Sequence, residues 1–122
     1  MLGKVIDMHN KFGLQQESKP QPLSEAEKTF RIVALREEVT EYEEAVTLED
    51  ELDALVDLQV FLLGTVHRHG MHEVFQEAFN RVMQANLQKE VANSAEASKR
   101  GFARDLIKPA GWTAPCLKDL VK

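Results

Sequence analysis

Apolar residues recur at helical spacing near the start of the chain and predict a short first helix. Ile6, His9 and Phe12 lie one helical turn apart, and Gly13 follows them as a stop signal. The next ten residues, 14–23, contain two prolines, which lack the backbone donor that a helix interior requires. We therefore expect an extended linker between the first helix and the second.

Two capping signals divide the middle of the chain into a pair of long helices. Ser24 with Glu27 fits a capping box and predicts a second helix that runs to about Val46. Thr47, with an acidic residue three positions later, predicts the start of a third helix, and Gly70 provides a left-handed stop for it. Two long helices joined by one or two residues must pack side by side in antiparallel fashion.

A fourth helix is predicted from Val74 to near Leu87, where apolar residues recur at i, i+4 and i+8. The chain beyond it is polar and then irregular, and we find neither strand alternation nor a hairpin turn dipeptide. The sequence therefore predicts an all-α fold. We expect a bundle of four to five helices with an antiparallel central pair and an irregular C-terminal tail, forming a single domain over residues 1–122.

Composition narrows the class of protein. The chain has 122 residues, of which 43% are hydrophobic and 29% charged, as is usual for one globular domain. No apolar run reaches the roughly 18–20 residues that a membrane span needs, and the first residues do not form a signal peptide. A single cysteine, Cys116, cannot form an intrachain disulfide. We expect a cytoplasmic protein without a membrane partner.

Charge is distributed unevenly along the chain. Residues 37–57 contain ten of the twenty acids and no Lys or Arg, whereas residues 81–122 carry eight bases and four acids. An acidic stretch on two packed helices repels itself unless the charges diverge or a cation joins them. The spacing of the carboxylates decides which of these two outcomes to expect.

The carboxylates fall on one stripe of each long helix. On the second predicted helix, Glu37 and Glu38 lie one turn before Glu41. On the third helix, three aspartates climb one face: Asp50, Asp53 and Asp57. Carboxylates that converge from two helices favour hard divalent ions such as Mg²⁺ or Mn²⁺. The alternative is a solvated acidic face in which the aspartates, set in the most apolar helix, pair with distant bases.

Histidines are the other candidate metal ligands. His67, His69 and His72 lie close to the predicted helix stop, but the first two point to different helix faces. An ordinary polar turn is therefore favoured over a histidine metal site. His9 is expected to pack half-buried on the first helix, and contact with a ligand is the alternative.

The acidic motifs resemble those of a known family. E-E-V-T-E (residues 37–41) followed by D-E-L-D-A-L-V-D (residues 50–57) resembles the EExxE…ExxD signature of the all-α nucleoside triphosphate pyrophosphatases. The match is closest to the branch of phosphoribosyl-ATP pyrophosphohydrolase and the MazG-like proteins. Four further segments agree in the same order: V-I-D-M-H-N-K-F-G-L (5–14), D-A-L-V-D-L-Q-V-F-L-L-G-T (53–65), N-L-Q-K (86–89) and K-P-A-G-W-T-A-P (108–115).

This resemblance implies an Mg²⁺-dependent hydrolase, with Mn²⁺ as an alternative ion, that cleaves a (d)NTP into a (d)NMP and pyrophosphate. The implied catalytic residues are Glu37 and Glu38, and the implied metal ligands are Glu38, Glu41, Asp50 and Asp53. Family members usually have Glu where this chain has Asp50, so the neighbouring Glu51 could take its place, and Asp57 is a further candidate.

The same resemblance implies substrate contacts in the last third of the chain. Asn86, Lys89 and Lys108 match positions expected to hold the nucleotide and its phosphates. Further basic candidates are Arg81, Lys99, Arg100 and Arg104. Trp112 could stack on a base, although a hydrophobic anchor for the tail is the favoured interpretation. The loop at residues 90–107 does not resemble the family.

Two alternatives remain open: a hydrolase of a phosphoribosyl-nucleotide pyrophosphate, and a non-enzymatic acidic helical dimerisation module. In each case we expect no nucleic acid polymer as partner. The apolar surface of the third and fourth helices exceeds what one thin layer can cover, and the resemblance points the same way. We therefore expect a homodimer or a dimer of dimers.

Overall fold

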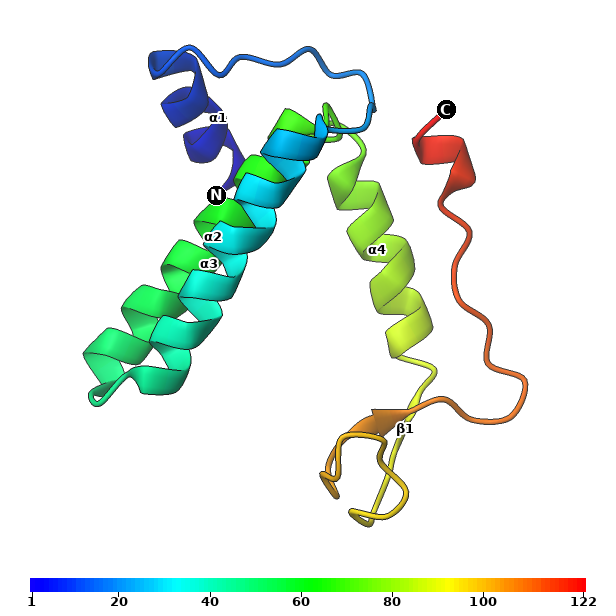
Figure 1. The fold of residues 1–122 in the computed structure, drawn as a ribbon. Helices are drawn as coiled ribbons and strands as arrows, with labels where there is room; N and C mark the ends of the chain where they lie inside the picture. The colour runs from blue at the N-terminus through cyan, green and yellow to red at the C-terminus, as the bar shows by residue number, and fades with distance from the viewer. The chain divides into compact units, whose positions relative to one another are not determined.

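The computed structural model describes all 122 residues and consists mainly of helices (Figure 1). The helices are α1 (Leu2–Lys11), α2 (Glu25–Glu44), α3 (Leu48–Arg68) and α4 (Phe75–Asn86). The remaining elements are two short strands, β1 (Glu90–Val91) and β2 (Leu106–Ile107), and a 3-10 turn, η1 (Lys118–Leu120). The predicted all-α class is confirmed. None of the helices combines the length and the apolar character that crossing a membrane would demand.

The two strands form a small antiparallel ribbon that the sequence did not predict. Glu90 pairs with Ile107, and Val91 pairs with Leu106. Each strand has only two residues, so it is too short to show the alternation of apolar and polar side chains by which a strand is recognised. The ribbon ties together the two ends of the loop at residues 92–105.

Both predicted helix starts are confirmed by side-chain caps. The Ser24 hydroxyl accepts a hydrogen bond from the backbone N–H of Glu27 at 3.1 Å. The Thr47 hydroxyl accepts one from the N–H of Asp50, also at 3.1 Å. The connection between α2 and α3 is residues 45–47, and it begins with extended backbone at Ala45 (φ −60°, ψ 136°). The two helices therefore pack as the predicted antiparallel pair.

The linker after α1 is fixed to the end of α3. Gly70 has φ of +68°, and a Cβ atom there would overlap the carbonyl oxygen of Lys19. The N–H of Gln21 donates to the carbonyl of His69 at 2.9 Å, and the His69 ring donates through Nδ1 to the carbonyl of Gln21 at 2.7 Å. Only glycine combines the left-handed backbone with the close approach that this junction requires.

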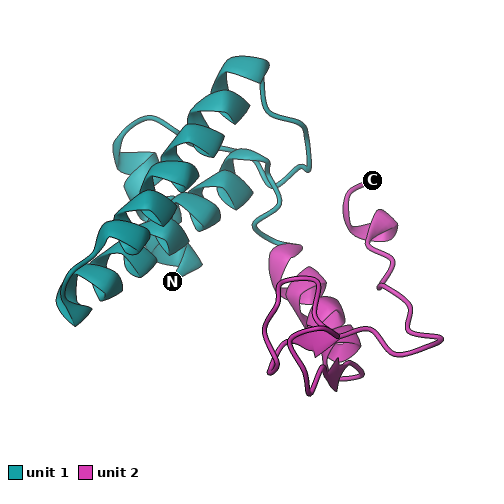
Figure 2. Cartoon of the chain, turned by 60° about the horizontal axis from the view of Figure 1, so that its bottom comes forward, with its two compact units in different colours: residues 1–73 teal, residues 74–122 magenta.

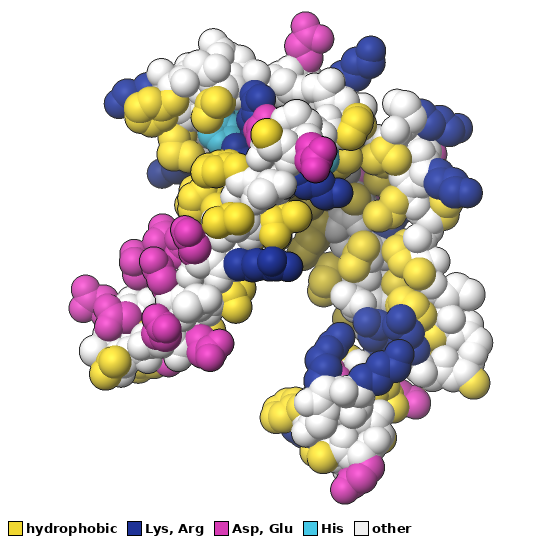
Figure 3. All heavy atoms as spheres, viewed as in Figure 1, with side chains coloured by type: hydrophobic (Ala, Val, Ile, Leu, Met, Phe, Trp, Pro, Cys, Tyr) yellow, Lys and Arg dark blue, Asp and Glu magenta, His cyan; other side chains and the backbone are white.

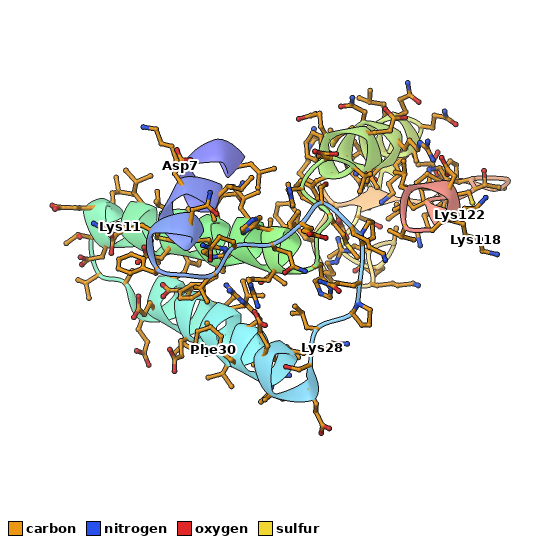
Figure 4. The ribbon with its side chains drawn as sticks, turned by 90° about the horizontal axis from the view of Figure 1, so that it is seen from above. Asp7, Lys11, Lys28, Phe30, Lys118 and Lys122 are labelled. Atoms are coloured by element: carbon orange, nitrogen blue, oxygen red, sulfur yellow. The ribbon has the colours of Figure 1, made fainter.

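The chain divides into two compact units, residues 1–73 and 74–122 (Figure 2). In the first unit, α3 lies between α1 and α2, as the view from above shows (Figure 4). Phe30 of α2, which is labelled there, meets Phe61 of α3 edge-on with 6.4 Å between ring centroids. The single domain over residues 1–122 stays a prediction.

In the second unit, two side chains fasten the C-terminal tail to α4. The Trp112 indole N–H donates to the carbonyl of Ala85 at 2.7 Å. The Arg81 guanidinium binds both carboxylate oxygens of Asp119, at 2.7 and 2.8 Å, and also the carbonyl of Cys116. These contacts hold an irregular segment in place without regular secondary structure.

Candidate active site

Three carboxylates meet on the hairpin formed by α2 and α3. Glu38 and Glu41 lie one turn apart on α2, and Asp57 lies opposite them on α3. One carboxylate oxygen of each lies within 4.8 Å of the others. Figure 3 shows acidic side chains gathered over this part of the hairpin. We call these three residues the carboxylate cluster.

Glu38 is the buried member of the cluster. Only 9% of the residue is exposed, and its Oε2 atom has no hydrogen-bond partner. Burial, then the hydrogen bond and negative charge of Glu41, then the charges of Asp57 and Asp53, raise the pKa of Glu38. Because a buried carboxylate oxygen is rarely left unpaired, this side chain needs either a proton or a cation.

Asp57, on α3, has an elevated pKa for reasons similar to those for Glu38. Burial raises its pKa, and the charges of Asp53 and Glu41 raise it further. No salt bridge in the structure involves any carboxylate between residues 37 and 57. The alternative in which these aspartates pair with distant bases therefore finds no support.

Asp53 lies nearer to solvent than the apolar sequence of α3 suggested. It is exposed, because α3 is covered by α1 and α2 on two sides only and its remaining flank is open. Asp53 and Asp50 line a surface cavity of about 280 Å³ that also includes Glu41. Glu41 thus belongs to both the cluster and this adjoining cavity.

Besides Asp50 and Asp53, two more of the predicted carboxylates, Glu37 and Glu51, lie outside the cluster. Glu37 lines a separate surface cavity of about 400 Å³, together with Val33, Arg36 and Glu41. Glu51 is half-buried in the first turn of α3 and belongs neither to the cluster nor to these cavities. The structure therefore brings Glu38, Glu41 and Asp57 together, with Asp53 and Asp50 beside them. The roles assigned to them stay predictions.

The donor set of the cluster fits a hard divalent cation. All its ligand atoms are carboxylate oxygens, which are the donors that Mg²⁺, Mn²⁺ and Ca²⁺ take, and it has no sulfur or imidazole donor that would favour zinc. A cation here would partner the orphaned Oε2 atom of Glu38 and remove the repulsion between the carboxylates. The arrangement therefore has the ligand atoms needed to hold a divalent metal ion.

His9 and His67 form a buried pair that the sequence interpretation missed. His67 is 1% exposed and His9 is 4% exposed, and their Nδ1 atoms lie 2.7 Å apart, at hydrogen-bonding distance. The ring of His72 stands edge-on to His67 with 4.9 Å between centroids. The expectations of a polar turn at His67 and a half-buried His9 were wrong, because α1 docks against this face of α3.

A glycine on α3 makes room for this packing. A Cβ atom at Gly64 would lie 2.9 Å from Nη1 of Arg31 and 3.1 Å from Nε2 of His9. Gly64 precedes His67 by three residues, so the two share one face of the helix. A glycine inside an apolar helix, one turn before a histidine, was the signal in the sequence for a close approach.

Burial and the positive charges of its neighbours keep His67 neutral. Burial, then the charges of His9, His72, Arg68 and Arg31, lower its pKa to about 4. Glu27 balances the two arginines, since Arg68 binds both of its carboxylate oxygens at 2.7 and 3.0 Å. No carboxylate of the cluster contributes to this shift, so the histidines are a packing feature separate from the candidate metal site.

The second unit holds the substrate-binding candidates. Asn86 ends α4, and the Nζ atoms of Lys89 and Lys108 each lie 5.2 Å from the ring centroid of Trp112. Arg81 is already occupied by salt bridges to Glu77 and Asp119. The hydrogen bond from Trp112 to α4 supports the interpretation of Trp112 as an anchor.

A comparison with models of known protein families finds one match to this chain. The family model described as phosphoribosyl-ATP pyrophosphohydrolase matches residues 5–86, about two thirds of the chain, and covers all four helices from Val5 onward. No curated protein matches the chain. The matched range contains the whole carboxylate cluster. The chain therefore belongs to the phosphoribosyl-ATP pyrophosphohydrolase family, within the MazG-like all-α superfamily, and is a hydrolase that acts on a phosphoanhydride bond.

Proposed function

We propose that the protein is an Mg²⁺-dependent nucleotide pyrophosphohydrolase that cleaves a (d)NTP between its α and β phosphates. One observation carries this proposal: the buried Oε2 atom of Glu38 has no partner and lies among the carboxylates of Glu41 and Asp57. A site that is unsatisfied without a cation, in a family of pyrophosphohydrolases, supports metal-dependent hydrolysis.

The proposed metal ligands are Glu38, Glu41 and Asp57 with Asp53, and Asp50 lies beside them at the adjoining cavity. When bound there, Mg²⁺ or Mn²⁺ supplies charge neutralisation of the phosphate chain and a lowered pKa of bound water. Glu37 and Glu38 are the proposed acceptors of the proton of the attacking water. The water oxygen joins the α phosphorus, the bond from that phosphorus to the bridging oxygen breaks, and pyrophosphate leaves.

A second candidate substrate is phosphoribosyl-ATP, which the description of the matching family names. A metal at the carboxylate cluster would act on the phosphate chain, which both substrates share, so the cluster suits both. The residues proposed to hold the nucleotide are Asn86, through its amide, and Lys89 and Lys108, through their charge. Arg81 and Trp112 contribute less, because both are committed to contacts that hold the tail.

The decisive experiment measures pyrophosphate release from a panel of NTPs, dNTPs and phosphoribosyl-ATP, with Mg²⁺, with Mn²⁺ and with EDTA. We expect release that depends on the metal and is absent in EDTA. Preference for phosphoribosyl-ATP over every NTP would select the second candidate. Equal rates with and without metal would contradict both, because neither uses the cluster in its metal-free form.

We also propose that the protein is a homodimer, with a dimer of dimers as the larger form. Large apolar side chains are exposed in the first unit, among them Phe30, Leu55 and Val56, each about half exposed. An apolar cavity of about 490 Å³ between α1 and α3, lined by Met8 and Val60 among others, adds to this surface. A second copy would cover it. Sedimentation that shows only a monomer at micromolar concentration would refute this assembly.

A further inference from the structure

The second unit contains a basic cavity of about 440 Å³ beside the ribbon and the loop at residues 92–105. Four basic side chains line it: Lys89, Lys99, Arg100 and Lys108. Asp105 is its one acidic lining residue. Figure 3 shows Lys and Arg side chains gathered over this end of the unit. A volume in the range of small-molecule sites, with several groups of one charge, is typical of an anion-binding pocket.

The three lysines of this cavity have no acidic partner. None of the salt bridges in the structure involves Lys89, Lys99 or Lys108. The ammonium groups of Lys89 and Lys108 instead lie 5.2 Å from the ring centroid of Trp112. Such cation–π contacts at exposed sites are worth about 0.5–1 kcal/mol, so they position the lysines without neutralising them.

Asp105 is fully engaged by its neighbours and is not available to the lysines. Its Oδ2 atom accepts from the Ser98 hydroxyl at 2.7 Å, and its Oδ1 atom accepts from Nη1 of Arg100 and from the N–H of Leu106, both at 2.9 Å. The hydrogen bond from Ser98, and then the charge of Arg100, hold the pKa of Asp105 below its usual value. Its one negative charge therefore leaves a surplus of positive charge in the cavity.

The loop that carries Lys99 and Arg100 is ordered by the same carboxylate. Ser98 is 8% exposed, and its hydroxyl also accepts from the N–H of Arg100 at 3.1 Å. The carbonyl of Asp105 accepts from the N–H of Ala92 at 2.8 Å and so closes the loop next to the ribbon. Lys99 and Arg100 are thus presented on a formed loop, which lowers the entropic cost of binding a ligand.

We propose that this cavity, which we call the ribbon pocket, binds the phosphoanhydride chain of a di- or triphosphate, with Lys99 and Arg100 as ligands beside Lys89 and Lys108. A polyanion would relieve the repulsion among the unpaired lysines and could engage Arg100 through its guanidinium. Lys89 and Lys108 are the positions that the family resemblance already implies, whereas Lys99 and Arg100 lie in the loop that does not resemble the family and beyond the range that the family model matches. The choice of a phosphoanhydride as ligand rests on the proposed function, whereas the pocket itself does not.

The test is calorimetric titration of the full chain with inorganic pyrophosphate in EDTA, so that no metal takes part. The double variant Lys99→Gln/Arg100→Gln should raise the dissociation constant for pyrophosphate at least about tenfold. This is the loss of affinity expected for one or two charge-assisted contacts. Lys118→Gln is the matched control, because it removes an exposed positive charge from the same unit outside the pocket. Equal weakening by the control, or no change in the double variant, would overturn the proposal.

Lysine acylation read by mass spectrometry locates the ligand without any substitution. Pyrophosphate should protect Lys99 and leave Lys118 as reactive as before. Single Lys99→Gln provides a second variant that spares the Arg100–Asp105 ion pair, so a loop disturbed in the double variant does not decide the result. Protection of both lysines alike would show general screening and would also refute the pocket.

Binding of ATP and AMP in EDTA identifies the part of the ligand that is recognised. Pyrophosphate and ATP should both bind, and AMP should bind at least about tenfold more weakly because it lacks the anhydride chain. AMP equal to ATP would overturn the assignment of a phosphoanhydride. A chain that hydrolyses nucleotides but binds pyrophosphate outside the ribbon pocket would refute this inference alone. Specific binding at the pocket without hydrolysis would refute only the proposed function.

Discussion

The two units of the chain carry opposite charge. Residues 1–73 contain seven bases and fifteen acids, a net charge of −8, whereas residues 74–122 contain eight bases and five acids, a net charge of +3. In the first unit the carboxylates of residues 37–57 form no salt bridge, and in the second unit the lysines of the ribbon pocket form none. Opposite charges have therefore been kept apart along the chain, which leaves one unit suited to a cation and the other to a phosphate.

The largest expected effect is on catalysis and concerns only the first unit. Glu38→Gln and Asp53→Asn should each lower the rate of pyrophosphate release about 1,000-fold, because each removes a charge that we propose holds the metal while keeping the shape of the side chain. The metal-free melting temperature should stay equal or rise, since a repulsive carboxylate has been neutralised.

Glu43→Gln is the matched control for this prediction. Glu43 lies on the same helix and in the same acidic run, but it is exposed and outside the carboxylate cluster. It should retain normal activity. An Asp53→Asn protein with full activity would exclude Asp53 from the site. A Glu38→Gln protein with full activity would contradict the proposed metal-dependent mechanism.

Substitution of one glycine in each unit compares how tightly the two units are packed. Gly70 and Gly101 both have positive φ, of +68° and +72°. A Cβ atom at Gly70 would overlap the linker backbone, whereas at Gly101 it would meet nothing within 4 Å. Gly70→Ala should therefore cost about 3 kcal/mol or more of unfolding free energy, and Gly101→Ala about 1 kcal/mol. Denaturant unfolding of the two variants measures both, and equal costs would show that the linker contact contributes nothing.

The buried histidines predict that the first unit is sensitive to acid. His67 has a folded pKa of about 4 against an ordinary value of 6.5, so between these limits the unfolded chain binds the proton and the folded one does not. Its contribution to stability is present above pH 6.5 and is lost as the pH falls toward 4, by about 1.4 kcal/mol per pH unit for the proton taken up.

The measurement for this prediction compares wild type with His67→Gln by denaturant unfolding between pH 4.5 and pH 7, in EDTA. Taking the difference removes the contribution of the cluster carboxylates. The groups that face His67 are His9, Arg31, Arg68 and His72, and all four are retained in the variant. Parallel pH profiles would show that His67 takes up its proton in the folded state.

The smallest expected effect is stabilisation by metal. Excess Mg²⁺ should raise the melting temperature by a few degrees, because an ion that binds only the folded chain shifts unfolding by mass action. The ribbon pocket variant Lys99→Gln should keep this shift, whereas Glu38→Gln should lose most of it. An unchanged melting temperature in wild type would count heavily against a metal at the cluster.

Local signals in the sequence were sufficient for the helices, and contacts between distant segments were not predictable from it. Ser24, Thr47 and Gly70 were identified correctly because each cap or stop depends on residues within one turn. The burial of His67 depends on α1, which lies nearly sixty residues earlier in the chain. The ribbon escaped prediction because two paired residues per strand leave no periodic pattern.

The sequence predicted which carboxylates share one face of α3, but it did not predict which of them meet the glutamates of α2. Asp53 and Asp57 share one face of α3 and lie one turn apart, so the spacing alone could not decide which of them lies level with Glu38 and Glu41 on α2. Packing of α3 against α2 sets this level, and it places Asp57 in the cluster and leaves Asp53 exposed. Side-chain periodicity predicts which residues share a helix face, whereas packing against the neighbouring helix decides which of them contact its side chains.

The position of Trp112 gives the protein a built-in optical reporter. It is the chain's single tryptophan, and its contacts with Ala85, Lys89 and Lys108 all lie in the second unit. The single tyrosine, Tyr42, lies on α2 in the first unit. Indole emission therefore follows events around the two lysines, because the first unit contains no tryptophan. Ligand binding in the second unit can be followed by fluorescence without a label.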